Sequence, residues 1–277
     1  MENYVLRNGV EIPKIGYGTW KTPDGDTCIQ AVETAIKTGY RHIDAAAVYG
    51  NEVSVGIALQ NSGVERKELF ITGKVWNTER GYGRTMRAFE KTCKDLQTDY
   101  LDLYLIHWPA SPSQYKCWKE LNSETWEALT DLYKAGKVRA IGVSNFRRRH
   151  LLPLLQEEII PMVNQLQLHP GMTQDDTIAL CREYDILPEA YSPLGNGKLL
   201  NSDSLRMIAE RYGKSQAQIC VKWSIQHGFL PLPKSLHEER MKMNRSVDDF
   251  ELKEEDMKAL DVLEGFGTGN DPDQITF

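Results

Sequence analysis

Short runs rich in Ile, Leu and Val alternate with longer segments of helical periodicity along nearly the whole chain. Near the N-terminus, Asn8-Gly9 joins YVLR to VEIP, and this dipeptide is typical of a tight hairpin turn. The longer segments repeat apolar residues every three or four positions, which predicts helices over residues 25–38, 85–96, 124–133, 173–184 and 215–227. The short runs predict eight strands, at IGYG, YRHID, LFITGK, LDLYLIH, VRAIGVS, MVNQLQ, ILPEAYS and FLPLPKS.

Eight strands alternating with helices over about 250 residues predict an α/β protein with a single (β/α)8 barrel, the TIM-barrel fold. We expect one domain over residues 1–277, with a β-hairpin at its N-terminus. The main alternative, an open dinucleotide-binding sheet, carries G-x-G-x-x-G after its first strand. Because GYGTWK (16–21) and GYGRTM (81–86) both lack the third glycine, the barrel is the better interpretation.

Composition narrows the function classes. Hydrophobic residues make up 41% and charged residues 26% of the chain, which is ordinary globular usage and excludes a disordered or fibrous protein. The formal net charge of -6 argues against a nucleic-acid binder. No apolar run reaches the roughly 18 residues of a membrane helix, and no apolar signal segment is visible at the N-terminus. The five cysteines form no C-x-x-C pair, so we expect neither a disulfide framework nor a zinc ribbon, and a cytoplasmic location.

Polar residues close seven of the predicted strands. In a barrel of this kind the catalytic groups lie at the C-terminal ends of the strands, where the loops converge. A polar residue at one strand end is more often a simple terminator, but Asp44, Lys74 and His107 end three consecutive strands and would meet at one mouth. The other four strands end at Ser144-Asn145, near Gln165, at Tyr191-Ser192 and at Lys234-Ser235.

These strand ends suit proton transfer to a carbonyl oxygen. A buried Lys74 requires an opposite charge, and Asp44 is the nearest candidate in the predicted layout. Tyr49 follows Asp44 closely, and a neighbouring ammonium would lower the pKa of its hydroxyl from the ordinary value of about 10. His107 could hydrogen-bond the same oxygen and orient a carbonyl beside it. The set predicts protonation of a carbonyl oxygen while a nucleophile, such as hydride, reaches the carbon.

Short motifs at the strand ends, taken in order, resemble the aldo-keto reductase family along nearly the whole chain. The resemblance implies an NADPH-dependent oxidoreductase that reduces a broad range of aldehydes and ketones and acts as a monomer. It also implies that the cofactor lies across the barrel mouth without a Rossmann fold, in agreement with the missing glycine fingerprint. The matching motifs are GYGTW (16–20), YRHIDAAAVYGNE (40–52), ITGKVWN (71–77), LDLYLIHWP (101–109), IGVSNF (141–146), NQLQLHP (164–170), AYSPLG (190–195) and LPKS (232–235).

By this similarity, four residues match the family's catalytic tetrad. Tyr49 would be the general acid, and Lys74 would modify the pKa of its hydroxyl. Asp44 would be the counterion of Lys74, and His107 would polarise and align the substrate carbonyl. In the oxidative direction Tyr49 would act as a general base.

Further positions match the family's cofactor site. Residues Ser144, Asn145 and Gln165 match the group that binds the nicotinamide carboxamide, for which hydroxyl and amide groups are suitable partners. Tyr191 matches the aromatic ring that stacks beneath the nicotinamide. Two cations and a hydroxyl match the pocket for the 2'-phosphate, which favours NADPH over NADH. They are Lys234, Ser235 and Arg240; the remaining cofactor matches are Ser192, Leu194 near the pyrophosphate, and Asn244 at the adenine.

One position departs from the family pattern. An acidic residue often precedes the asparagine that contacts adenine, but Met243 stands there in this chain. This puts one adenine contact in doubt. The alternative interpretation of Met243 is ordinary packing within its helix.

Aromatic positions match the family's substrate cleft. Their alternative interpretation is core packing, since Trp is commonly buried. The loop predicted over residues 111–122 could set specificity, and the short tail GFGTGNDPDQITF resembles the bacterial and protozoal branches, which predicts an open cleft. The candidate substrate-binding residues are Trp20, Val48, Trp76 and Trp108, together with His107.

Two other functions fit parts of the pattern. His42 and Asp44 lie on one face of a strand, and with His107 and His169 they could hold the metal of a barrel hydrolase, although Lys74 would repel that metal. An NADPH-binding regulatory subunit with little turnover is the non-enzymatic alternative. The charged runs 147–149 and 253–256 are interpreted as solvated helix faces.

Overall fold

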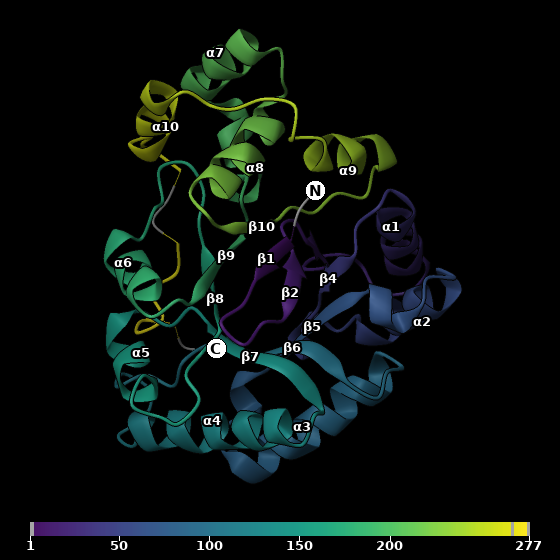
Figure 1. Ribbon diagram of the computed structural model, residues 1–277, viewed down its shortest axis with the longest axis vertical. Helices are drawn as coiled ribbons and strands as arrows, with labels where there is room; N and C mark the ends of the chain where they lie inside the picture. Colours follow the sequence, from purple (N-terminus) through teal and green to yellow (C-terminus); the bar gives the residue numbers. More distant parts are fainter. Residues whose placement is uncertain (1–2, 267–268, 276–277) are drawn as a thin grey trace.

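The computed structural model describes residues 3–266 and 269–275 of the chain. Its centre is an eight-stranded parallel sheet in the order β10-β9-β8-β7-β6-β5-β4-β3 (Figure 1). The sheet closes on itself, because the backbone N–H groups of Gly16 and Gly18 donate to the carbonyls of Pro231 and Pro233 over 3.0 and 3.3 Å. The predicted (β/α)8 barrel is therefore confirmed. Its strands are β3 (Tyr17–Gly18), β4 (His42–Asp44), β5 (Phe70–Val75), β6 (Leu101–Ile106), β7 (Val138–Ser144), β8 (Val163–Gln167), β9 (Leu187–Tyr191) and β10 (Leu230–Leu232).

The glycines of the GYG motif serve the seam of the barrel. A Cβ atom on Gly16 would lie 2.4 Å from Leu232 Cδ2 and 2.7 Å from His42 Nδ1, so only glycine fits where the first and last strands meet. Closure of the barrel thus explains a motif that could be mistaken for part of a dinucleotide-binding loop.

The predicted N-terminal hairpin is also confirmed, with β1 (Asn3–Val5) antiparallel to β2 (Glu11–Pro13). Its side chains reach the starts of the barrel strands. The Tyr4 hydroxyl donates to the Phe229 carbonyl over 3.2 Å, and the Asn8 amide donates to the Arg139 carbonyl over 2.9 Å. The hairpin therefore closes the N-terminal end of the barrel and leaves the opposite end for the site.

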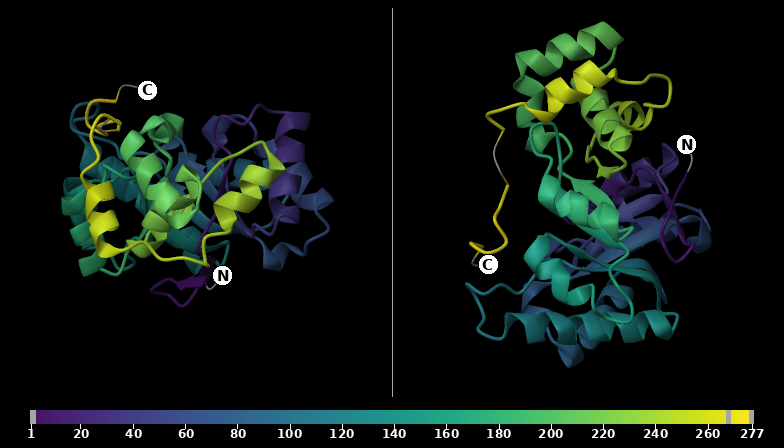
Figure 2. Two further views of the ribbon diagram at one scale, coloured as in Figure 1. Left: turned by 90° about the horizontal axis from the view of Figure 1, so that it is seen from above. Right: turned by 60° about the vertical axis from the view of Figure 1, so that its left-hand side comes forward.

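Helices surround the barrel, and the described residues contain ten where the sequence predicted five (Figures 1 and 2). The five predicted helices are all present, although the third begins at Trp118, so the end of the predicted loop 111–122 is helical. The helices are α1 (Asp26–Lys37), α2 (Glu52–Asn61), α3 (Tyr82–Asp95), α4 (Trp118–Lys134), α5 (Arg148–Leu154), α6 (Asp175–Glu183), α7 (Asp203–Tyr212), α8 (Gln216–Gln226), α9 (Glu238–Arg245) and α10 (Glu254–Asp261), with 3-10 turns η1 (Ala47–Tyr49), η2 (Arg66–Glu68), η3 (Asn77–Glu79) and η4 (Gly195–Asn201).

The helices that the sequence analysis missed are short and depend on packing. α2 has no one-sided apolar pattern, and it packs so closely on the end of α3 that a Cβ on Gly56 would lie 2.4 Å from the Asp95 carbonyl oxygen. α5 has only 7 residues and contains Pro153. Such helices are marginal by themselves and form because the barrel covers one of their faces. No helix of the described residues is long and apolar enough to cross a membrane.

The interpretation of residues 253–256 as a solvated face is wrong for its last member. Asp256 is buried, accepts a hydrogen bond of 2.6 Å from the Tyr212 hydroxyl, and lies 2.8 Å from Arg211 Nη2. This contact ties α10 to α7. A buried charge of this kind is stable because a cation and a hydroxyl satisfy it.

A buried carboxylate near the start of the barrel strands joins three of them. Asp102 on β6 is fully buried, and its oxygens lie 2.7 Å from the guanidinium groups of both Arg66 and Arg139. The same carboxylate accepts the backbone N–H of Ile71 on β5 over 2.9 Å. Asp102 is therefore the shared ion-pair partner of two cations and completes a hydrogen bond at the sheet.

We expect Asp102→Leu to lower the free energy of unfolding by about 3 kcal/mol, because it removes the shared partner of two cations. Urea denaturation measures the change. The control is Glu65→Ala, which removes an exposed pair with Lys67 and should cost less than about 1 kcal/mol. Equal losses in the two variants would contradict the account of Asp102.

Candidate active site

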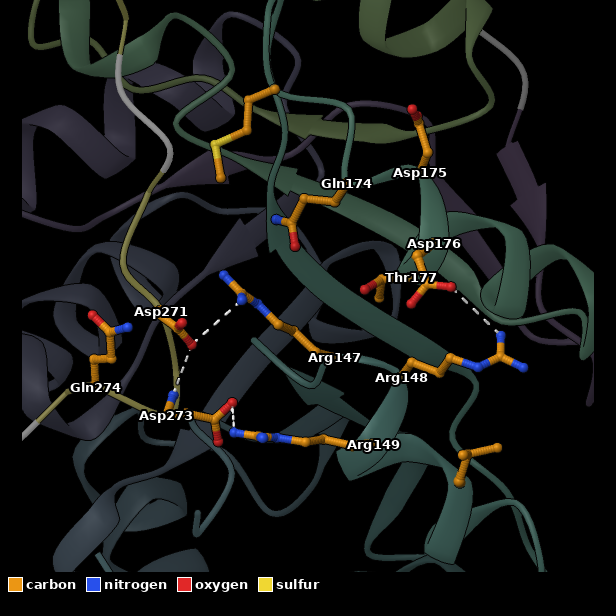
Figure 3. Close-up of a pocket in the computed structure, with 12 residues that line it drawn as sticks. Arg147, Arg148, Arg149, Gln174, Asp175, Asp176, Thr177, Asp271, Asp273 and Gln274 are labelled. Carbon is orange, nitrogen blue, oxygen red and sulfur yellow. Dashed lines mark hydrogen bonds and ion pairs between the residues drawn. The ribbon is translucent and has the colours of Figure 1, made fainter. Parts of the chain in front are cut away.

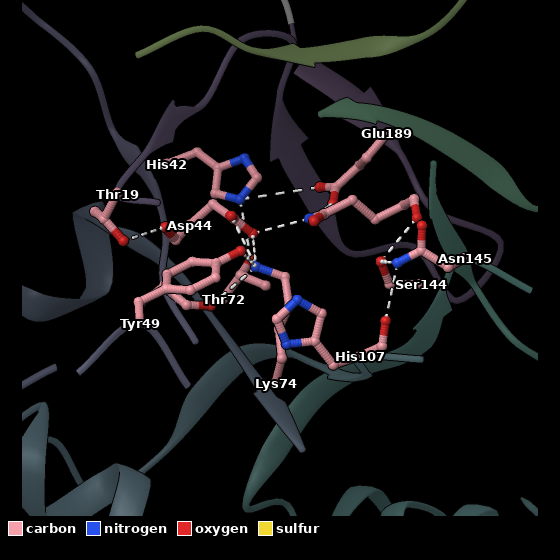
Figure 4. A network of polar contacts seen from close by, with 12 residues as sticks. Thr19, His42, Asp44, Tyr49, Thr72, Lys74, His107, Ser144, Asn145 and Glu189 are labelled. Atoms are coloured by element: carbon pink, nitrogen blue, oxygen red, sulfur yellow. Dashed lines mark hydrogen bonds and ion pairs between the residues drawn. The ribbon is translucent and has the colours of Figure 1, made fainter. Parts of the chain in front are cut away.

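The four residues matched to the catalytic tetrad meet at the C-terminal mouth of the barrel (Figure 4). Asp44 ends β4, Tyr49 ends η1, Lys74 lies near the end of β5 and His107 follows β6. Lys74 Nζ lies 2.7 and 2.8 Å from the two carboxylate oxygens of Asp44 and 3.3 Å from the Tyr49 hydroxyl. The Tyr49 and His107 rings meet edge to face, with centroids 5.7 Å apart. The ammonium thus lies between a carboxylate and a phenol.

Lys74 is fully buried and remains a cation because its partners compensate for burial. Burial lowers the pKa of Lys74, but the negative charge of Asp44 and the contact with Tyr49 outweigh it and raise the pKa above the ordinary value. The Ala45 carbonyl accepts a further hydrogen bond from Nζ over 3.0 Å. The ammonium therefore has partners for its donors and a fixed position.

The pKa of the Tyr49 hydroxyl is raised, whereas the sequence analysis expected it to be lowered. Burial raises its pKa to about 12, even though Lys74 lowers it as anticipated, because loss of water outweighs the neighbouring cation. Asp44 adds a smaller raising effect. Tyr49 is therefore a neutral phenol at ordinary pH, with an adjacent cation that stabilises the phenolate formed when the proton leaves.

His107 is neutral. Burial, together with the positive charge of Lys74, lowers the pKa of its imidazole well below the ordinary value. Its Nδ1 atom is buried and has no hydrogen-bond partner among the described residues. The Trp76 and His107 rings meet edge to face, with centroids 5.1 Å apart. A neutral imidazole can donate a hydrogen bond to a carbonyl oxygen, which fits alignment rather than protonation.

A second polar layer lies below the tetrad. The amide nitrogen of Gln165 donates to Asp44 Oδ1 over 2.8 Å and to Glu189 Oε2 over 2.9 Å. His42 Nε2 lies 2.9 Å from the Thr72 hydroxyl and 3.9 Å from Glu189. The sequence analysis missed Glu189, although it precedes Tyr191 by two residues and so lies on the same face of its strand.

The residues matched to the carboxamide site form one hydrogen-bonded group. The Asn145 amide donates to the His107 carbonyl and to the Ser144 hydroxyl, both over 3.0 Å. The Tyr191 hydroxyl donates to Asn145 Oδ1 over 2.8 Å, and the Ser144 hydroxyl donates to the Gln165 carbonyl over 2.8 Å. Four neighbouring strand ends, those of β6 to β9, are thereby linked at the mouth of the barrel. Ser192 and Leu194, in the loop that follows, are partly exposed.

The residues matched to the phosphate pocket follow β10: Lys234 and Ser235 lie in the loop before α9, and Arg240 lies in the first half of α9. Lys234 and Arg240 are exposed, and no carboxylate of the described residues is paired with either. Ser235 is nearly buried, and its hydroxyl accepts the backbone N–H of His237 over 3.0 Å. Asn244 is buried, whereas Met243 is 42% exposed, so the packing interpretation of Met243 is wrong.

The aromatic positions matched to the substrate cleft differ in exposure. Trp20 is 44% and Val48 is 42% exposed, which contradicts core packing for both. Trp76 is partly exposed and Trp108 is buried. Large apolar side chains left exposed beside a polar mouth suit an apolar ligand.

The arginine triplet belongs to a separate hollow, lined by the starts of α5 and α6 and by the C-terminal tail (Figure 3). Arg147 lies 3.3 Å from Asp271, Arg148 lies 3.8 Å from Asp176, and Arg149 pairs with Asp273. The three side chains remain well exposed, in agreement with the interpretation of a solvated face, and each also pairs with an acidic residue. The tail also accepts hydrogen bonds from Ser113 and Gln114.

The candidate metal ligands have other partners. Both Asp44 oxygens contact Lys74, and His169 Nδ1 lies 2.8 Å from the Pro170 carbonyl at a turn. Within residues 3–266 and 269–275, no three His, Cys, Asp or Glu side chains are arranged to hold a metal ion.

Comparison with known proteins agrees with this geometry. Residues 14–264 match the model of the aldo/keto reductase family. The chain is 49% identical to a glyoxal reductase of Bacillus subtilis, over 98% of this chain and 96% of that protein. It is 44% identical to the 9,11-endoperoxide prostaglandin H2 reductase of Trypanosoma cruzi, over 98% and 94% of the two chains.

Solved structures are also similar to this chain in sequence and in fold. An aldo/keto reductase from Brucella melitensis is 44% identical, with a TM-score of 0.87 over 94% of this chain and 98% of that one. A point mutant of Gox0644 in complex with NADPH is 37% identical, with a TM-score of 0.90 over 99% and 98%. The chain is an oxidoreductase that belongs to the aldo/keto reductase family.

Proposed function

We propose that this protein reduces aldehydes and ketones to alcohols with NADPH, with Tyr49 as the proton donor. The observation that carries the proposal is the position of Lys74 Nζ, which contacts both the Asp44 carboxylate and the Tyr49 hydroxyl. The similarity to a glyoxal reductase supports small aldehydes among the substrates. The exposed side chains of Trp20 and Val48 support broad acceptance of apolar groups.

The chemistry of the mouth suits NADPH. Gln165, Asn145 and Ser144 would hold the carboxamide, and the Tyr191 ring would lie beneath the nicotinamide. Lys234 and Arg240 would hold the 2'-phosphate with Ser235, since both cations lack a carboxylate partner among the described residues. Ser192, Leu194 and Asn244 would contact the rest of the dinucleotide. The NADPH complex of the related Gox0644 mutant supports this cofactor.

In the reductive direction each group at the mouth has one task. Bound NADPH supplies the hydride. His107 donates a hydrogen bond that orients the carbonyl oxygen beside Tyr49. Tyr49 transfers its proton to that oxygen, and Lys74 stabilises the phenolate that remains. Asp44 keeps Lys74 charged in a site that excludes water.

The two rival functions have distinct signatures. Metal hydrolysis conflicts with the use of both Asp44 oxygens by Lys74. A regulatory subunit would bind NADPH tightly without turning it over. Oxidation of NADPH in the presence of 4-nitrobenzaldehyde supports the reductase, and tight NADPH binding without turnover would favour the regulatory role.

Replacement of Tyr49 by Phe should lower kcat by about 10²–10⁴-fold, because general acid catalysis contributes that much. The dissociation constant of NADPH should be nearly unchanged, since the hydroxyl is directed at the substrate. Steady-state kinetics and fluorescence titration measure the two effects. Unchanged turnover would refute the assignment of Tyr49.

The pH dependence should differ between directions. With a pKa of about 12, Tyr49 keeps its proton at lower pH. His107 stays neutral above its lowered pKa. The rate of carbonyl reduction should therefore not change through the titration of either group between pH 6 and 9. Alcohol oxidation needs the phenolate, whose fraction rises about tenfold per pH unit below the pKa. Initial rates in both directions test this. An oxidation rate that falls as pH rises would contradict it.

Substitution of Lys234 by Ala should raise the dissociation constant of NADPH far more than that of NADH, because only NADPH carries the 2'-phosphate. Fluorescence titration with both cofactors measures the ratio. The matched control is Lys198→Ala, an exposed lysine of η4 that is not assigned to the phosphate. An equal effect of Lys234→Ala on both cofactors rejects the phosphate role.

A further inference from the structure

Glu189 is a fully buried carboxyl group that the reaction described above does not use. Figure 4 shows Glu189 beside the tetrad. It lies on β9, in register with Gln165 on β8 and two residues before Tyr191. Its Oε2 atom accepts a hydrogen bond from Gln165, and its Oε1 atom has no hydrogen-bond partner in the described part of the chain. A carboxyl group inside a barrel is costly, and the next polar neighbour of Glu189, His42 Nε2, lies 3.9 Å from Oε1, so the one hydrogen bond with Gln165 indicates a specific role.

That contact fixes the orientation of the Gln165 amide. Nε2 of Gln165 lies 2.8 Å from Asp44 Oδ1 and 2.9 Å from Glu189 Oε2. Only the amino group of an amide can donate two hydrogen bonds to two carboxyl oxygens. A flipped amide would bring its oxygen against Asp44. The amide oxygen of Gln165 is therefore directed away from both carboxyl groups, and no donor of the described residues is paired with it.

We propose that Glu189 is a positioning residue for the cofactor: together with Asp44 it holds Gln165 so that the amide oxygen accepts an N–H of the nicotinamide carboxamide. The inference rests on the proposed function, in which Gln165 binds that carboxamide. Asp44 thus holds both the lysine of the tetrad and the amide that contacts the nicotinamide. Glu189 supplies the second acceptor, without which one N–H of Gln165 would be buried and unpaired.

The surroundings of Glu189 favour a neutral acid. Burial, with the nearby negative charge of Asp44, raises its pKa to about 8, while Gln165 and Lys74 lower it less. His42, the other ionisable neighbour, is neutral because burial lowers its pKa to about 3. A neutral acid still offers an oxygen to Gln165 but does not compete with Asp44 for Lys74. Glutamine at position 189 would reproduce this acceptor.

The test compares Glu189→Leu with the matched variant Glu189→Gln, using two reduced cofactors. One is NADPH. The other is its 3-acetylpyridine analogue, in which a methyl group replaces the amide NH2. This analogue therefore offers no N–H to the amide oxygen of Gln165. Fluorescence titration gives the dissociation constants, and steady-state kinetics separates kcat from KM. Glu189→Met replaces Glu189→Leu if the latter does not fold, since Met adapts to irregular core space.

For Glu189→Leu we expect the dissociation constant and KM of NADPH to rise about tenfold, the effect of one lost hydrogen bond, with kcat largely retained. Glu189→Gln should restore the parent values, and the acetylpyridine analogue should bind the Leu variant and the parent alike. An equal loss with both cofactors, or no rescue by Gln, overturns the positioning role.

A further variant separates this inference from the proposed function. Gln165→Leu should weaken NADPH binding at least as much as Glu189→Leu does. If Gln165→Leu leaves NADPH affinity unchanged, the cofactor role assigned to Gln165 is wrong. If Gln165→Leu weakens binding but Glu189→Leu does not, only the positioning role of Glu189 is overturned.

Discussion

The mouth of this barrel depends on one buried ion pair. Lys74 is fully enclosed, and a charge in that position is stable only because Asp44 accepts it through both carboxylate oxygens. The same ammonium contacts Tyr49, and the same carboxylate contacts Gln165. Removal of either partner would leave the other as an isolated buried charge, so the proton-transfer and amide-binding parts of the site share one electrostatic origin.

The ion pair acts on a phenol that burial keeps protonated. Burial raises the pKa of Tyr49 more than Lys74 lowers it, which yields a donor that keeps its proton until a strong acceptor forms nearby. His107 is also neutral, but there burial and the neighbouring cation act in the same direction and both lower the pKa of the imidazole. The Lys74 cation, held in place by Asp44 beside two neutral side chains, can stabilise negative charge at the moment it develops, without reorganisation of water.

The barrel and the tetrad could be predicted from the sequence because both leave local patterns. Apolar runs mark strands buried on both faces, and polar residues such as Lys74 end these runs where chemistry occurs in this fold. The role of Glu189 left no such pattern, because its contact with Gln165 depends on the register between β8 and β9. The pKa of Tyr49 depends on enclosure, which residue types do not specify. Asp256 looks like any surface acid until α10 packs against α7.

The effect of the ion pair on Lys74 can be measured directly by following the protonation of its Nζ atom through the nitrogen resonance in 15N-lysine-labelled protein. We expect Lys74 to remain an ammonium at pH values where exposed lysines have lost their protons, because Asp44 raises its pKa. In Asp44→Asn the same nitrogen should lose its proton at a clearly lower pH, since the largest effect that opposes burial is then removed. Equal pKa values in the two proteins would contradict the account.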